Sequence, residues 1–349
     1  MAPTKTARWI LRAQTGLDGL VYQESSPIPE VKADEVLVEL HAASLNYRDL
    51  VVTKGGSGSS IPNVIPSSDG AGIVRAVGSS VTGFEIGDKV CTHLAPFIAD
   101  DQWPNFGNIT AGLGQQVNGT LTEYGVFPQT AIVHMPNNCS FAQAATLTCS
   151  ALTAWNALFG LQGRQPKKGD WVLTQGTGGV SIAALQFAVA AGANVIASTS
   201  SDEKAERLLA LGASHVINYR QTPRWGEVAK GMTPGKQGVD IVVDVGGENT
   251  LGESMKAVKV NGLVVAAGLV AGTVENEKPA LIDTLWNLCI VRGVLLGTRN
   301  QFKEMNRFVE VKGIDLAVDE KVFDLKDARR AYERLQQQQH FAKVVIRIR

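Results

Sequence analysis

Apolar positions in the first third of the chain follow a two-residue period. Val36, Val38 and Leu40 alternate with the residues between them, which is the pattern of a strand. Glycines then recur at short intervals through residues 70–87, as they do in a domain with many tight turns. The pattern therefore predicts a β-rich first domain. A long irregular segment at residues 94–118 is expected to be a lid or wall over a site.

A different pattern begins at residue 171. The apolar run 171–173 has the composition of a buried strand, and a glycine turn follows it. From residue 180 to 191 apolar residues recur at helical spacing, Gly192 is expected to end that helix, and 195–197 reads as a second strand. The order strand, glycine turn, helix, strand is that of a βαβ unit that binds dinucleotides.

The glycine turn has a chemical use in such a unit. Gly176, Gly178 and Gly179 carry no Cβ, so backbone amides can approach a pyrophosphate, and the following helix directs its N–H groups at that anion. Ser181 stands where a third glycine is usual, which predicts slightly wider helix packing. The alternative is an ordinary structural turn that binds nothing.

Strands and helices continue to alternate after this unit. Further apolar runs are expected to be strands of one parallel sheet, at 214–219, 239–247, 262–272 and 287–297. The fold class predicted from these patterns is α/β.

Composition narrows the class of protein. The 349 residues suffice for two domains, and 33 basic against 33 acidic residues give no reason to expect a nucleic-acid partner. No apolar run reaches the ~20 residues of a membrane helix. The four cysteines lack paired spacing and the N-terminus lacks a signal segment, so a cytoplasmic protein with reduced thiols is expected.

Several motifs occur in a fixed order along the chain. They are NYRD at Asn46, GAG at Gly70, VGSSVTGFEIGDKV at Gly78, GTLTEY at Gly119, AATLTCSALTAWNAL at Ala144, and the glycine turn. Over nearly the whole chain this order resembles the medium-chain dehydrogenase/reductase family. Within that family the chain looks most like the zinc-independent quinone oxidoreductases and their zinc-type alcohol-dehydrogenase-like relatives.

The resemblance implies two domains. A GroES-like β-rich catalytic domain is expected at residues 1–130, completed by 298–349. A Rossmann domain with a doubly wound parallel sheet, which binds NADP, is expected at residues 131–297.

The resemblance also implies where a catalytic zinc would sit. The family's three ligand positions fall on Asn46, Ser68 and Cys149. Catalytic zinc needs three protein ligands of cysteine, histidine or carboxylate type, and only one of these residues qualifies. Residues 92–120 hold no cysteine for a structural zinc. The sequence therefore predicts a protein without a metal.

The same motifs suggest the catalytic residues. The resemblance places Asn46 and Tyr47 near the nicotinamide, where Asn46 can donate a hydrogen bond to a substrate carbonyl or to the cofactor ribose. Tyr47 can donate a proton, or can merely shape the pocket. Asp49 and Asp69 are interpreted as structural carboxylates.

The end of the second strand of the βαβ unit indicates the cofactor. Residues 198–201 are hydroxyl side chains and Lys204 follows, whereas NAD-binding units usually have a carboxylate there. Asp202 is expected to cap the next helix. NADPH-using relatives bind the 2′-phosphate with residues that match Ser200, Lys204 and Tyr219, so NADPH is the predicted cofactor. The resemblance adds Thr177, Gly179 and Val180 at the pyrophosphate, Gly268 and Leu269 at the nicotinamide half, and Lys343 reaching the cofactor.

Three functions remain open at this stage. The leading hypothesis is an NADPH-dependent reductase of activated C=C bonds or quinones, acting on a small-molecule substrate. The others are a zinc-free alcohol dehydrogenase or carbonyl reductase, and a protein that binds NADPH without turnover. A homodimer is predicted because residues 287–297 read as an apolar edge strand that pairs with its twofold mate in similar proteins.

Overall fold

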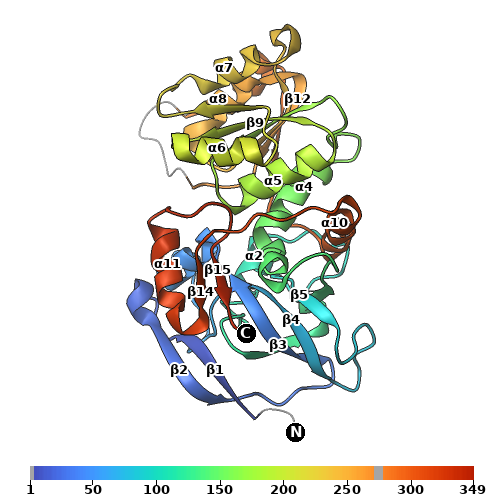
Figure 1. The fold of residues 1–349 in the computed structure, drawn as a ribbon, viewed down its shortest axis with the longest axis vertical. Helices are drawn as coiled ribbons and strands as arrows, with labels where there is room; N and C mark the ends of the chain where they lie inside the picture. Colours follow the sequence, from blue (N-terminus) through green and yellow to red (C-terminus); the bar gives the residue numbers. More distant parts are fainter. Residues whose placement is uncertain (1–3, 271–277) are drawn as a thin grey trace. The chain divides into compact units, whose positions relative to one another are not determined.

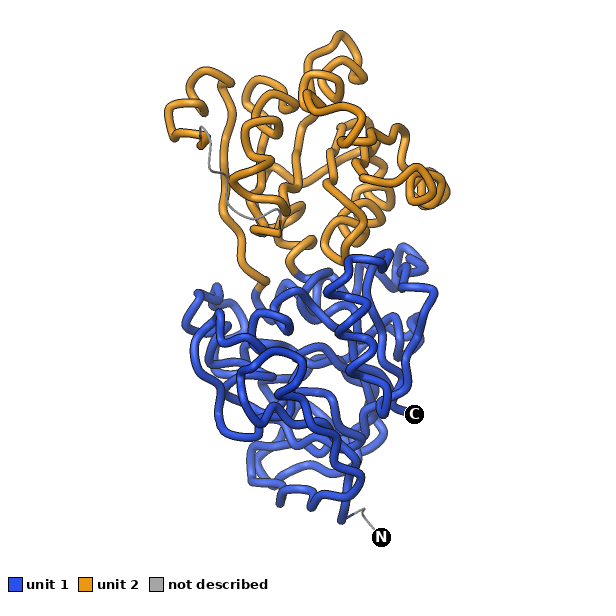
Figure 2. The backbone as a smooth tube through the Cα atoms, turned by 90° about the vertical axis from the view of Figure 1, so that its left-hand side faces the viewer, with its two compact units in different colours: residues 1–152, 298–349 blue, residues 153–297 orange. Residues whose placement is uncertain are grey.

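The computed structural model describes residues 4–270 and 278–349 (Figure 1). The chain divides into two compact units (Figure 2). Unit 1 comprises residues 1–152 and 298–349, and unit 2 comprises residues 153–297. The first division falls at 152/153 instead of the expected 130/131. Residues 131–152 stay with unit 1 because β7 (Ile132–His134) pairs with β5 (Lys89–Thr92) and α3 (Phe141–Ala144) packs on the same sheet.

Unit 1 is built on β-strands, as the alternating pattern predicts. In its described residues, one sheet has the strand order β14-β15-β3-β4-β5-β7, with β6 also paired to β3, and β1 and β2 form a separate pair. The remaining bounds are β1 Lys5–Leu11, β2 Leu20–Pro27, β3 Glu35–Ser44, β4 Asp69–Val77, β6 Tyr124–Pro128, β14 Val322–Asp324 and β15 Val345–Arg347. β3 and β4 approach closely at Gly72, where a Cβ would lie 2.1 Å from the carbonyl oxygen of Glu39. Only glycine fits there.

The described residues of unit 1 also form helices. They are α1 (Tyr47–Thr53), α2 (Phe106–Thr110), α10 (Arg299–Lys312) and α11 (Ala328–Gln336), besides α3. The apolar face of α11, with Ala331, Tyr332 and Leu335, packs in a buried cluster with Trp9. A π-helical turn at Leu147–Ala151 leads into α4 (Leu152–Phe159).

Unit 2 is a parallel α/β unit. Among its described residues the sheet has the order β10-β9-β8-β11-β12-β13, with every neighbouring pair parallel. The strands are β8 Trp171–Gln175, β9 Asn194–Thr199, β10 His215–Asn218, β11 Val239–Asp244, β12 Val258–Ala266 and β13 Ile290–Gly293. The helices are α5 Gly179–Ala190, α6 Asp202–Ala210, α7 Trp225–Gly231, α8 Glu248–Ala257 and α9 Asp283–Asn287.

The chain of unit 2 reverses direction across its sheet. After β8 it runs outward through β9 and β10, and it then returns to the other side of β8 for β11, β12 and β13. The carboxyl ends of β8 and β11 therefore meet at a switch point, where such sheets bind ligands. The predicted doubly wound sheet is confirmed. The strand expected at 262–272 begins at Val258 and ends at Ala266, and the last two residues of that prediction lie outside the described residues.

The irregular segment 94–118 is anchored within unit 1. The Arg48 guanidinium donates to the carbonyl oxygens of Ile109 (3.0 Å) and Leu113 (3.2 Å), and to Gln115 Oε1 (3.1 Å). Arg48 belongs to α1, so these hydrogen bonds attach the segment to that helix. Within residues 4–270 and 278–349, no helix is both long enough and apolar enough to cross a membrane.

Candidate active site

Asn46 lies at the junction of β3 and α1, where the chain is extended before the helix begins (φ −117°, ψ 160°). Its backbone N–H donates to Asp49 Oδ2 at 2.7 Å, which fixes the first turn of α1. Its side-chain oxygen accepts from Lys343 Nζ (2.5 Å) and from Ser150 Oγ (3.1 Å). The side chain is therefore held in the interior of unit 1 and is only 7% exposed.

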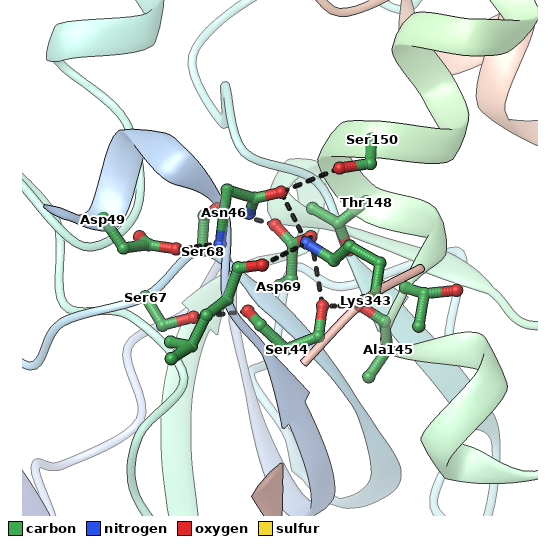
Figure 3. A network of polar contacts seen from close by, with 12 residues as sticks. Ser44, Asn46, Asp49, Ser67, Ser68, Asp69, Ala145, Thr148, Ser150 and Lys343 are labelled. Carbon is green, nitrogen blue, oxygen red and sulfur yellow. Dashed lines mark hydrogen bonds and ion pairs between the residues drawn. The ribbon is translucent and has the colours of Figure 1, made fainter. Parts of the chain in front are cut away.

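Lys343 brings a positive charge into the same interior (Figure 3). It precedes β15, is 4% exposed, and donates to Leu45 O (2.8 Å), Asn46 Oδ1 and Asp69 Oδ2 (3.1 Å). An ammonium has three N–H groups, so each one has an oxygen acceptor. The ammonium thus points at the amide of Asn46, whereas the sequence suggested a direct reach to the cofactor.

Asp69 pairs with this ammonium and is completely buried. It opens β4 and lies opposite Ser44 of β3 in the sheet register. Its Oδ1 accepts from Ser68 Oγ (2.7 Å), and its Oδ2 also accepts from Ser44 Oγ (3.4 Å). A buried ion pair is tolerated only when further hydrogen bonds satisfy its atoms, as they do here.

The amide nitrogen of Asn46 is the open position of this cluster. Because Oδ1 faces two donors, Nδ2 must occupy the other branch of the amide. Nδ2 is buried and has no hydrogen-bond acceptor among the described residues. An unmet buried donor costs about 1–3 kcal/mol. An oxygen of a bound ligand would remove that cost.

The π-helical turn supplies the other side of the cluster. Ser150 donates to Asn46, and Thr148 Oγ1 donates to the carbonyl oxygen of Thr92 at 2.8 Å. The sequence motif drew attention to Cys149 between them. Burial, with Asp69 next, raises the pKa of the Cys149 thiol to about 12, so it is protonated at neutral pH. Sequence reasoning missed Ser150, because a π turn leaves no periodic signal.

These residues do not fit a catalytic zinc. At the three positions of the family's ligands the chain offers an amide, a hydroxyl that donates to Asp69, and a protonated thiol. The Lys343 ammonium already lies 2.5 Å from Asn46 Oδ1, and a second cation beside it would be repelled. Across the described part of the chain, no group of three histidine, cysteine, aspartate or glutamate side chains could hold a metal ion.

Two further residues of the NYRD motif differ in environment. Tyr47 opens α1 and is 52% exposed. Asp49 is 3% exposed. Burial, with the Asp69 carboxylate, raises the pKa of Asp49 to about 6, and the opposing charge of Arg48 limits the rise. Tyr47 thus lies at the surface of unit 1, and Asp49 lies in its interior, bonded to the backbone N–H of Asn46.

In unit 2 the predicted pyrophosphate residues surround the start of α5. Gly176 follows β8 with a φ of +76°, which favours glycine, and Gly178 is the N-cap of the helix. Thr177 lies between them, and Gly179 and Val180 form the first turn. Ser181, in place of a third glycine, donates from Oγ to the carbonyl oxygen of Gln175 and ties the helix to the end of β8. The first N–H groups of α5 therefore stand at the carboxyl edge of the sheet.

The three predicted 2′-phosphate residues follow two neighbouring strands. Ser200 comes directly after β9 and Tyr219 directly after β10, and Thr199 pairs with Asn218 in the parallel register. Lys204 lies in the first turn of α6. Tyr219 is 40% exposed. The structure therefore brings Ser200 and Tyr219 to one corner of the sheet.

The expected cap of α6 was assigned to the wrong residue. Ser201 is the N-cap, and its Oγ accepts from the backbone N–H of Lys204 at 3.4 Å. Asp202 instead accepts from Asn218 Nδ2 (2.7 Å) and Gln221 Nε2 (3.3 Å). Its carboxylate is thereby bound to the residues at and just after the end of β10.

Gly268 and Leu269 follow β12, at the same edge of the sheet as the glycine turn. A Cβ on Gly268 would lie 2.7 Å from the carbonyl oxygen of Val245, so the loops after β11 and β12 touch there. Leu269 is 73% exposed.

Sequence reasoning missed the carboxylate that holds these loops. Asp244, at the end of β11, is fully buried and accepts several hydrogen bonds. The donors are Gly246 N, Gly247 N, Thr250 Oγ1, Ser254 Oγ and Gln175 Nε2. Asp244 thus connects the end of β8 to the loop beside Gly268. A lone acidic residue at the end of an apolar run gave the only sequence signal.

Comparison with known proteins identifies the class. Residues 32–137 match the alcohol dehydrogenase GroES-like domain, and residues 179–311 match the zinc-binding dehydrogenase domain. A zinc-type alcohol dehydrogenase-like protein of Schizosaccharomyces pombe is 44% identical over 338 residues, which are 96% of each chain. These matches define an oxidoreductase with a GroES-like domain and a Rossmann domain.

Solved structures agree with this class. A protein from Sinorhizobium meliloti 1021 described as an alcohol dehydrogenase superimposes with a TM-score of 0.90 at 34% identity, covering 100% of both chains. An NAD-dependent alcohol dehydrogenase gives 0.85 at 31% identity, covering 98% of this chain and 100% of that one. The 2-octenoyl-CoA carboxylase reductase CinF, in complex with NADP and 2-octenoyl-CoA, gives 0.83 at 25%, covering 99% and 88%.

The chain belongs to the medium-chain dehydrogenase/reductase superfamily, whose dehydrogenases bind nicotinamide cofactors. The predicted family and fold class are confirmed.

Proposed function

We propose that this protein is an NADPH-dependent oxidoreductase that transfers hydride to an activated C=C bond, as in an enone, or to a quinone, without zinc. The observation that carries the proposal is the buried Nδ2 of Asn46, which has no hydrogen-bond acceptor among the described residues, while the oxygen of the same amide accepts from Lys343 and Ser150. It is a fixed donor for one acceptor oxygen, in a cluster whose side chains do not fit zinc.

The chemistry of such a donor favours conjugated acceptors. NADPH supplies the hydride from its nicotinamide C4. Hydride delivery to a plain ketone places a full alkoxide charge on one oxygen, which a metal ion would stabilise by several kcal/mol. Hydride delivery to the β-carbon of an enone spreads the charge over an enolate, and a quinone spreads it over an aromatic ring. A hydrogen bond from Asn46 Nδ2 to the acceptor oxygen then suffices. Tyr47 or water supplies the proton, to the α-carbon of an enone or to the phenolate oxygen of a reduced quinone.

The corner formed by Ser200, Lys204 and Tyr219 supports NADPH over NADH. Hydroxyl and ammonium groups can bind a 2′-phosphate, whereas a carboxylate directed at it would repel it. The nearby carboxylate, Asp202, is engaged by Asn218 and Gln221. The NADP complex of CinF gives a precedent among similar structures.

A second candidate is a zinc-free alcohol dehydrogenase or carbonyl reductase. It is favoured by the names of similar proteins, several of which are alcohol dehydrogenases. In that case Asn46 Nδ2 would donate to the carbonyl oxygen that receives the charge, and Tyr47 would protonate the alkoxide.

Isotope transfer distinguishes these functions. The protein is incubated with C4-deuterated NADPH and an enone, and the product is analysed by NMR. Deuterium at the β-carbon supports the proposal. Deuterium at the carbinol carbon, with the C=C bond intact, establishes the carbonyl reductase, and no transfer to any enone, quinone or aldehyde in a panel would indicate a protein that binds NADPH without turnover.

We further propose that the protein is a homodimer formed at the edge of the unit 2 sheet. In the described residues β13 pairs only with β12, so one side of this strand is an open edge. Exposed apolar side chains lie in and beside the neighbouring helix α9, at Leu281, Leu285, Trp286 and Leu288. A twofold mate pairing along β13 would cover both the edge and these side chains.

A further inference from the structure

We propose that Lys343 is a positioning residue that polarises the Asn46 amide, so that Nδ2–H acts as a charge-assisted donor to the carbonyl oxygen of the acceptor. The inference rests on the proposed function and adds a source of positive charge to it. Three side chains carry it, and they come from separate parts of unit 1: Asn46 before α1, Asp69 at the start of β4, and Lys343 before β15 (Figure 3).

Among the described residues, only the oxygen end of the Asn46 amide has hydrogen-bond partners. Its Oδ1 accepts from the Lys343 ammonium at 2.5 Å and from the Ser150 hydroxyl at 3.1 Å, while Nδ2 has no acceptor among the described residues. Donors on the oxygen of an amide draw electron density from its nitrogen, because the two atoms share one π system. Hydrogen bonds in such a chain strengthen one another. The N–H groups of Nδ2 therefore become stronger donors.

The charge of Lys343 is effective because little water surrounds it. Lys343 is 4% exposed and Asp69 is 0% exposed, so their interactions are weakly screened. Asp69 balances the ammonium, yet its charge is also shared with Ser68 Oγ at 2.7 Å and Ser44 Oγ at 3.4 Å. The ammonium nevertheless keeps its contact with the Asn46 amide oxygen, at 2.5 Å.

A purely structural role for Lys343 makes a different prediction. Its contact with Leu45 O ties the segment before β15 to the end of β3, so losing the side chain would lower stability in any case. If that were its whole role, every acceptor would be reduced more slowly in proportion to the loss of folded protein. If Lys343 polarises Asn46, the reduction rate should fall most for substrates that accept hydride poorly. Reduction of these substrates depends most on the hydrogen bond that Asn46 donates.

The test uses a variant in which no buried charge is left alone. Lys343→Met combined with Asp69→Asn removes both charges, and the full-length protein is compared with the wild type. We expect kcat for an enone to fall about ten- to a hundredfold, the scale of a lost charge-assisted hydrogen bond, and kcat for an electron-poor quinone to fall much less. The NADPH Kd, measured by fluorescence, should stay within about threefold, because the three N–H groups of Lys343 bond to protein oxygens.

Two single variants serve as matched controls. Ser150→Ala removes a neutral donor from the same amide oxygen and should lower the enone rate by a smaller factor. Ser67→Ala removes a buried hydrogen bond, from Ser67 Oγ to Ser44 O at 3.0 Å, that does not touch Asn46. It should leave the ratio of enone to quinone rates unchanged. An equal fall for both acceptors in the double variant would overturn the proposal.

A spectroscopic measurement separates this inference from the proposed function. In protein labelled with ¹⁵N-asparagine, the side-chain NH₂ protons of Asn46 should resonate further downfield in the wild type than in the double variant. This shift requires no turnover. Unchanged Asn46 resonances would refute the polarisation even if enones are reduced, whereas a shift without enone reduction would refute only the proposed reaction.

Discussion

Replacing Asp49 with asparagine should change how the stability of unit 1 depends on pH. Burial raises the pKa of this carboxyl to about 6 from its ordinary value of 3.8. The native state therefore binds the proton more tightly than the unfolded chain. The stabilisation is fully present below pH 3.8 and is lost as the pH rises through about 6. A difference of about two pKa units corresponds to about 3 kcal/mol.

The groups around Asp49 modify the pKa shift that burial causes. Arg48 on the same helix and Lys343 lower the pKa, as does the backbone N–H of Asn46, while Asp69 raises it. Tyr332 of α11 also faces Asp49, and burial raises the pKa of its phenol well above 10, so it stays neutral throughout the test. Asparagine keeps an oxygen for the Asn46 N–H and carries no charge, which isolates the ionisation from the hydrogen bond.

The assay is urea unfolding of both proteins between pH 4 and pH 7. The free energy of unfolding of Asp49→Asn, relative to the wild type, should increase by about 2.4 kcal/mol over this range, with a slope of about 1.2 kcal/mol per pH unit in its steep part. Glu39 and Asp100, whose pKa values are lowered by ion pairs, affect both proteins equally and cancel. Parallel curves would refute the assignment of a raised pKa to Asp49, and so would a wild type that gains relative stability as the pH rises.

Three further outcomes are expected. Lys204→Ala should weaken NADPH binding about ten- to a hundredfold while leaving the NADH Kd nearly unchanged, because only NADPH carries a 2′-phosphate; equal weakening of both would contradict the assignment. Enzyme dialysed against a chelator should keep its activity and show no stoichiometric zinc by elemental analysis, and loss of activity restored by zinc would disprove the metal-free site. Trp286→Glu should convert a dimer into a monomer by light scattering at micromolar concentration, since it places a charge among the exposed apolar residues of α9; a wild type that is already monomeric would rule out the dimer.

Local patterns in the sequence predicted most of the fold. The βαβ order around Gly176 predicted β8, α5 and β9, and alternation at Val36, Val38 and Leu40 predicted β3. Each of these signals comes from neighbouring residues, whose periodicity depends on which face is buried. The N-cap of α6 was assigned to the wrong residue because Ser201 and Asp202 are both good caps, and only the contact of Asp202 with Asn218 separates them.

The candidate site was predicted only in part, for a physical reason. The NYRD motif identified Asn46, but the partners that orient its amide come from distant positions in the chain. Asp69 and Lys343 are separated by 274 positions, and no periodicity connects them. Lys343 stood out only as a basic residue in a terminal strand. Its burial against Asp69 follows from the pairing of β15 with β3, which depends on the tertiary fold.

The position of Lys343 has a consequence for biosynthesis. Asn46 and Lys343 lie 297 positions apart, and all of unit 2 is made between them. Unit 2 is one uninterrupted stretch, so it can fold while the ribosome is still translating residues 298–349. Unit 1 must wait, because β3 gains its partner β15 only after that stretch has emerged. Until then Asp69 is a carboxylate without its cation, and a nascent chain has a complete unit 2 before it has a complete unit 1.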